Sequence, residues 1–172
     1  MPSLPSLSSG LSLPLSLPQR LLPRAVSHRV SCDAPPADVW AVLCEPSRWP
    51  EFELFLDRVT GAGGRVAEGQ RLLGVSRGGM LRVPIDVRRV VPRKALRIMV
   101  HTVPGLREQV EHVLVPTARG GTEITIVVRT EGPLAMAALL PLWVSSSVTA
   151  RMLARTAERE HRRRLRKAAG VA

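Results

Sequence analysis

The chain is 172 residues long and 45% apolar, which suits a single domain with its own hydrophobic core. Only two cysteines occur, without a CxxC spacing, and this argues against a disulfide framework and for buried thiols in a reducing compartment. The formal net charge is +11, but residues 151–172 carry eight basic and two acidic side chains, or +6 of that excess. Without a helix-turn-helix pattern, and with only 3% aromatic residues for base stacking, the charge alone does not support nucleic-acid binding.

Residues 1–24 form a segment of repeated proline, serine and leucine. Its prolines, at positions 2, 5, 14, 18 and 23, prevent a helix longer than about two turns, so we predict a disordered leader. No positive charge precedes the leucines and proline interrupts them, which is not the pattern of a secretory signal and indicates a cytoplasmic protein. A wrongly assigned start codon, with the protein beginning near Arg24, explains the segment equally well.

The first part of the folded region changes from a strand pattern to a helix pattern. Residues 28–33 alternate in polarity and end in Asp-Ala-Pro-Pro, which predicts a strand followed by a turn. Apolar residues then recur at helical spacing over residues 36–45, and Pro46 ends this short helix. Residues 47–52 are aromatic and bounded by prolines, so we predict a turn or a second short helix there.

A series of strands follows, separated by glycine or proline turns about ten residues apart, as in an antiparallel meander. The two Gly-Gly pairs, at 78–79 and 120–121, are the strongest hairpin signals. In the last strand the residues at 124, 126 and 128 are apolar and the alternate positions are mostly polar, so one face of the sheet is buried. The predicted strands are residues 55–61, 70–77, 80–91, 95–103, 107–116 and 122–131.

The apolar face of this sheet needs a cover, and the apolar run after residue 133 predicts a helix over residues 134–165, kinked or restarted at Pro141. Large apolar residues recur along it and predict a stripe that lies on the sheet, formed by Leu140, Val144, Val148 and Met152. Residues 134–150 are apolar over 17 positions, short of the ~20 needed to span a bilayer, so we reject a transmembrane segment.

Three motifs, in order, resemble the START-like (SRPBCC) superfamily of lipid-transfer domains, birch-pollen allergens and polyketide cyclase/dehydrase proteins. They are APPADVWAVL at 34–43, PSRWPEF at 46–52 and GGTEIT at 120–125, and the resemblance runs from about residue 28 to 160. It implies an α+β helix-grip fold: a curved antiparallel seven-stranded sheet wrapped around a long C-terminal helix, with two short helices after the first strand. The chain then divides into a leader (1–24), a START-like ligand-binding domain (25–160) and a basic tail (161–172).

The resemblance also implies a cavity between sheet and helix that holds a hydrophobic or aromatic small molecule. Trp49 and Phe52 resemble residues that the family places near the cavity mouth. Strand alternation supplies the other candidates, although the same pattern also suits a solid core without a cavity. These candidates are Val83, Ile85, Val87, Ile98, Val100, Leu114, Ile126 and Val128 from the sheet and Leu140, Val144, Val148 and Met152 from the helix.

His112 shares a strand face with Val110 and Leu114, so we expect an inward polar group that hydrogen-bonds a ligand, acts as an acid or base, or has only a structural role. The histidines lack metal-ligand spacing, and no metal site is predicted. No phosphate loop, dinucleotide fingerprint or GxSxG motif occurs either, so no cofactor is expected.

Two functions remain open at this stage. The first is binding or transport of a lipid, isoprenoid or polyketide-like molecule in the cavity. The alternative is a polyketide cyclase/dehydratase acting by general acid/base catalysis, for which Arg89, His112, Ser147 and Thr149 are candidates. Catalytic members of the superfamily often use tyrosine, and this chain has none, which favours binding over catalysis.

The C-terminal arginines begin with Arg151, Arg155 and Arg159, four residues apart on one helix face. One interpretation is a solvated helix end whose positive charges complement the helix dipole. The other is peripheral attachment to an anionic membrane surface.

Overall fold

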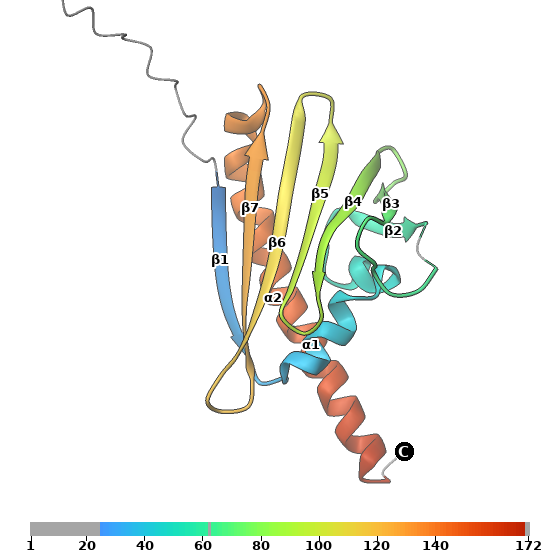
Figure 1. Cartoon of the computed structure of the whole chain (residues 1–172), viewed down its shortest axis with the longest axis vertical. Helices are drawn as coiled ribbons and strands as arrows, with labels where there is room; N and C mark the ends of the chain where they lie inside the picture. Colours follow the sequence, from blue (N-terminus) through green and yellow to red (C-terminus); the bar gives the residue numbers. More distant parts are fainter. Residues whose placement is uncertain (1–24, 62, 171–172) are drawn as a thin grey trace, which may run out of the picture.

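The computed structural model describes residues 25–61 and 63–170, and the predicted leader lies outside the described residues. Seven strands and three helices follow one another in the predicted order (Figure 1). The strands are β1 (Ala25–Cys32), β2 (Leu56–Thr60), β3 (Arg71–Ser76), β4 (Arg82–Val91), β5 (Ala95–Val103), β6 (Leu106–Pro116) and β7 (Thr122–Glu131). The helices are α1 (Pro36–Leu43), the 3-10 helix η1 (Pro46–Glu51) and α2 (Ala135–Ala168).

All seven strands form one antiparallel sheet in the order β1-β7-β6-β5-β4-β3-β2. Strands β2 to β7 pair with their neighbours in sequence, and β1 is added beside β7. The predicted hairpin glycines are confirmed, because Gly78, Gly79 and Gly120 have φ of 82°, 72° and 84°, where a residue with a Cβ is strained. The chain has the α+β helix-grip fold that its motifs predict.

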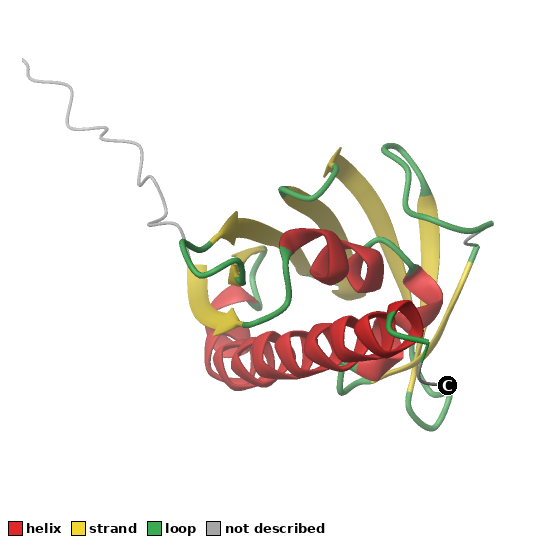
Figure 2. Ribbon diagram, turned by 90° about the horizontal axis from the view of Figure 1, so that it is seen from below, coloured by secondary structure: helices red, strands yellow, loops and turns green. Residues whose placement is uncertain are grey.

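Helix α2 crosses the concave side of the curved sheet, as Figure 2 shows. It packs mainly on β1, β7 and α1. The helix runs through Pro141 and continues unbroken to Ala168, so the predicted division at residue 160 does not coincide with the end of an element. Its last turns are instead tied to α1, because buried Asp38 forms an ion pair with Arg164 at 2.6 Å and lies within hydrogen-bond distance, 2.7 Å, of the His161 Nδ1.

The sequence pattern predicted the wrong buried side for the first half of α2. Leu140 and Val144 are 73% and 49% exposed, so they do not face the sheet. Small and hydroxyl-bearing residues face it instead: Ala135, Ser146, Thr149, Ala150, Ala154 and Ala157, together with Leu153. Because apolar residues occur all round residues 134–150, periodicity did not identify the buried face, and the helix approaches the strands through its smallest side chains.

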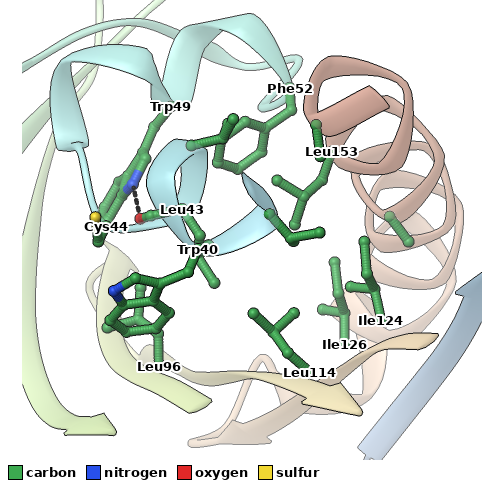
Figure 3. Close-up of a cluster of buried hydrophobic side chains, with 14 of the residues drawn as sticks. Trp40, Leu43, Cys44, Trp49, Phe52, Leu96, Leu114, Ile124, Ile126 and Leu153 are labelled. Carbon is green, nitrogen blue, oxygen red and sulfur yellow. Dashed lines mark hydrogen bonds between the residues drawn. The ribbon is translucent and has the colours of Figure 1, made fainter. Parts of the chain in front are cut away.

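The closely packed core lies where α1 and η1 meet the sheet and α2 (Figure 3). Trp40 and Leu43 of α1, and Phe52 just after η1, meet Leu153 of α2 there, together with Leu96 of the sheet. Both cysteines are buried and unpaired, as predicted, and burial raises the pKa of each thiol.

The observed phase of α2 predicts unequal effects for two leucine truncations. Leu153→Ala removes a fully buried side chain and should lower the free energy of unfolding by about 2 to 5 kcal/mol. Leu140→Ala removes an exposed side chain and should change it by less than about 0.5 kcal/mol. Urea denaturation of both variants checks this. A larger loss of stability for Leu140→Ala than for Leu153→Ala would mean that Leu140 faces the sheet, as the sequence predicted.

Candidate ligand-binding site

The inner face of the sheet carries most of the strand residues nominated from the sequence. Register aligns them in rows across the strands, for example Ile85, Val100 and Glu108 in one row and Val87, Ile98 and Val110 in the next. Val100 is half-buried. The nominated strand residues that are buried are Val83, Ile85, Val87, Ile98, Leu114, Ile126 and Val128. Their inward orientation is as expected, and their contact with a ligand stays a prediction.

Trp49 and Phe52 are core residues that hold η1 in place. Their exposed fractions are 3% and 1%, and the indole Nε1 of Trp49 donates a hydrogen bond to the Leu43 carbonyl at 2.9 Å (Figure 3). Both side chains therefore have a structural role in the core. A ligand contact for either one stays a prediction.

His112 is the polar group at the centre of the inner face. Its exposed fraction is 3%, and it lies in a row between Leu96 of β5 and Ile126 of β7. Burial lowers its pKa to about 4, against a smaller opposing effect of the Leu96 backbone, so the ring is neutral at pH 7. Neither ring nitrogen makes a hydrogen bond of good geometry within the described residues. A buried donor and acceptor without hydrogen bonds of good geometry lower the stability of the folded protein.

Two carboxyl groups form a second polar region toward the β5–β6 turn. Glu108 lies on the inner face of β6, 7% exposed, and accepts a hydrogen bond from Thr102 at 2.8 Å. Glu53, just after η1, accepts one from Thr149 of α2 at 3.1 Å. Desolvation raises the pKa of both carboxyls, that of Glu53 to about 7, and the charge of Glu108 adds to the shift at Glu53. The electrostatic coupling and the shared direction of the shifts indicate one acidic region inside an otherwise apolar interior.

Sequence reasoning missed both carboxyl groups. Glu108 had a signal, because it shares the period-two face of Val110, His112 and Leu114. Glu53 had none, because it lies between a 3-10 helix and a strand, where no periodicity applies. His28 was also missed as a site residue: it lies beside Ile126 in the His112 row, and Trp143 of α2 packs edge-on against it at 5.5 Å.

Several nominated polar and helical residues lie elsewhere. Arg89 is exposed because the β4–β5 register shifts between Val87 and Arg89, which reverses the alternation that placed it inside. Ser147 bonds the Val144 carbonyl on the outer side of α2, whereas Thr149 is buried beside Glu53. Leu140 and Val144 are exposed, while Val148 and Met152 are half-buried at the margin of the interior.

Two surface pockets lie at opposite ends of the sheet. The larger, about 740 Å³, is at the β5–β6 turn, and Thr102, the partner of Glu108, is among its lining residues. The smaller, about 350 Å³, lies beside Trp40, Arg65 and Arg164. Within residues 25–61 and 63–170, no group of three or more histidine, cysteine or acidic side chains is placed to hold a metal ion.

The curved sheet, the two short helices after β1 and the long covering helix define a START-like protein of the helix-grip class. A family model described as polyketide cyclase/dehydrase and lipid transport matches residues 23–170, and the chain belongs to this family. No curated protein matches the chain.

Solved structures agree with the fold at low sequence identity. Protein MLL2253 from Mesorhizobium loti has a TM-score of 0.66 at 22% identity, over 78% of this chain and 97% of that one. The crystal structure of Ara h 8.0201 has a TM-score of 0.60 at 14% identity, over 77% of this chain and 96% of that one. BexL, a di-domain ARO/CYC from the BE-7585A biosynthetic pathway, has a TM-score of 0.64 at 13% identity, over 78% and 46%. At these identities the likeness shows the fold alone.

The raised pKa of Glu53 predicts a pH-dependent stability. In the folded protein Glu53 keeps its proton at pH values where the unfolded chain has lost it, so its contribution is complete below about pH 4.5 and is lost as pH rises to about 7. The free energy of unfolding should therefore fall more steeply between about pH 5 and pH 8 in the wild type than in Glu53→Gln. Urea denaturation across this range measures the difference.

The exposed Glu131→Gln serves as the control and should follow the wild-type curve. Parallel curves for wild type and Glu53→Gln would show that the Glu53 carboxyl is not desolvated in the folded protein.

Proposed function

We propose that the protein binds a largely apolar small molecule between the inner face of the sheet and α2, with His112 as its central hydrogen-bonding group. The observation that carries the proposal is a neutral histidine, 3% exposed, whose two ring nitrogens have no hydrogen-bond partner of good geometry within the described residues. A ligand oxygen placed at the ring would supply the missing partner. Membership of a family described as including lipid transport supports an apolar ligand.

The charge state of His112 narrows the ligand chemistry. Because burial keeps the ring neutral at pH 7, one nitrogen donates a hydrogen bond and the other accepts one. The neighbouring side chains, Leu96 and Ile126, are fully apolar. A hydroxyl or carbonyl oxygen on an apolar body fits these surroundings, whereas a carboxylate or phosphate would be desolvated without a positive charge to pair with. This agrees with a lipid alcohol, an isoprenoid or a polyketide-like ligand.

A second candidate function is dehydration or cyclisation of a polyketone, and the acidic region favours it. With a pKa of about 7, Glu53 is partly protonated at neutral pH and suits a general acid, while its coupled neighbour Glu108 also has a raised pKa. BexL, whose name includes ARO/CYC, has the same fold. In this case Glu53 would give its proton to the departing hydroxyl, which leaves as water, the carboxylate form of Glu108 would take the proton from the adjacent carbon as the C=C bond forms, and His112 would position the chain.

Native mass spectrometry of the purified protein tests the binding proposal first. A co-purifying hydroxylated or carbonyl-bearing apolar molecule would support it, and recovery of that molecule unchanged would favour carriage over catalysis. An empty protein that takes up neither a fluorescent fatty acid nor a polyaromatic phenol would mean that the interior is filled by side chains and that the proposal is wrong.

His112→Leu separates the ligand role from the structural role. In the ligand-free protein the change removes a buried polar group that has no hydrogen bond of good geometry, so the free energy of unfolding at pH 7 should rise by about 1 to 3 kcal/mol. The affinity for the co-purified molecule, or for the polyaromatic phenol, should fall about tenfold or more because one hydrogen bond is lost. If His112 has only a structural role, His112→Leu should instead lower the free energy of unfolding.

The matched control is Ile126→Leu, which changes the shape but not the polarity of the neighbour in the same row. It should cost less than about 1.5 kcal/mol of stability and leave the hydrogen bond to the ligand intact.

A further inference from the structure

The outer face of α2 carries an apolar surface that the fold leaves uncovered. We call the α2 patch the exposed side chains at the start of this helix and on the adjoining β5–β6 turn. The two segments touch, because the Leu134 backbone N–H donates a hydrogen bond to the Gly105 carbonyl, and Figure 1 shows them together at one end of the molecule. The members, with their exposed fractions, are Val103 (36%), Leu134 (45%), Met136 (59%), Leu140 (73%), Trp143 (53%) and Val144 (49%).

This exposure is unusual for a helix of such composition. An 18-residue window of α2 is long and apolar enough to cross a membrane, yet only 22% of it is buried in the protein. The same helix packs on β1, β7 and α1 with its other face, so it covers the sheet and does not span a bilayer. Its outer side therefore presents large apolar residues to the surroundings, and Trp143, at the edge of that side where it packs against His28, is still 53% exposed.

The positive charge next to the patch indicates its partner. Arg151 and Arg155 lie two and three turns after Val144 on the same side of α2, and both are exposed. Neither makes an ion pair within the described part of the chain. By contrast, two arginines farther along the helix form ion pairs with acidic residues of the same chain. Arg163 pairs with Glu160, and Arg164 pairs with Asp38. The free positive charge of the helix thus begins where the apolar surface ends.

We propose that the α2 patch docks on the surface of an anionic lipid bilayer, with its apolar side chains in the headgroup region and Arg151 and Arg155 beside the lipid phosphates. An exposed apolar helix face that contains tryptophan and borders arginine is the pattern of an interfacial helix. A second copy of the chain fits less well, because each molecule carries a net charge of +11 and the two would repel. The inference rests on the outer face of α2 and is independent of the proposed interior site.

Trp143 provides a direct probe of docking. The chain has three tryptophans, and Trp40 and Trp49 are 8% and 3% exposed, so Trp143 is the one that a membrane can reach. The full chain is mixed with vesicles of phosphatidylcholine alone or of phosphatidylcholine with phosphatidylglycerol. We expect co-sedimentation with the anionic vesicles, a blue shift of the tryptophan emission, and quenching by lipids brominated near the headgroup. Trp143→Phe should lose the spectral changes while still sedimenting.

Paired variants separate docking from general attraction of a positive protein to negative lipid. Leu140→Gln with Val144→Gln, and Arg151→Gln with Arg155→Gln, should each lower partitioning about tenfold. The controls are Leu165→Gln, an exposed apolar residue of α2 outside the patch, and Arg119→Gln, an exposed charge on the β6–β7 loop, and both should bind as the wild type does.

Three results would overturn the proposal. The first is no sedimentation with anionic vesicles at low salt. The second is sedimentation without a Trp143 blue shift and without sensitivity to the Leu140 and Val144 changes, which means charge attraction only. The third is a dimer in light scattering that the same two changes abolish, in the absence of vesicle binding, which would assign the patch to a second copy of the chain.

Discussion

The close contact of α2 with β1 and β7 is the constraint on which the rest of the structure depends. A sheet with one apolar face is stable only when that face is covered. The helix approaches these two strands through alanine, serine and threonine, which lets it lie close to them. It therefore covers the β1–β7 side of the sheet directly, while α1 contacts β6 and η1 contacts β2.

The interior is not uniformly apolar, and this bears on function. His112 and Glu108 are buried and Glu53 is half-buried, and desolvation shifts the pKa of each toward the neutral form. Glu53 and Glu108 have threonine partners, whereas His112 has none of good geometry among the described residues. An interior that served packing alone would gain stability from apolar side chains at these positions. Three titratable groups at these positions are consistent with the proposal that the interior binds a ligand with a polar group.

The two proposals assign the two faces of α2 to different tasks. On its inner face Thr149 donates a hydrogen bond to Glu53 and Leu153 packs in the core. Its outer face bears the α2 patch. A molecule that holds an apolar ligand inside and rests on a lipid surface outside would not need to release that ligand into water. Cytoplasmic localisation stays a prediction from the absence of a secretory pattern.

The sequence by itself predicted the strands, the pairing of β2 to β7 with their neighbours in sequence and most of the inward faces, whereas the position of β1 beside β7 is a finding of the structure. Period-two alternation with one apolar side excludes a slip of one residue, because such a slip would expose the whole apolar set. The same alternation placed His112 inside and contained the signal for Glu108. It failed at Arg89, where a register shift reverses the faces, because such a shift depends on the pairing of two strands and not on either one alone.

Only the tertiary structure decided which side of α2 is buried and which groups meet inside. Over residues 134–150 every side of the helix has apolar residues, so the size of the side chains decided which side is buried. Small side chains pack closely on β1 and β7, and the large side chains of Leu140 and Val144 remain exposed. Glu53 and Thr149 are 96 residues apart, and their hydrogen bond exists only because η1 and α2 lie against each other. Local periodicity carries no information about contacts of this kind.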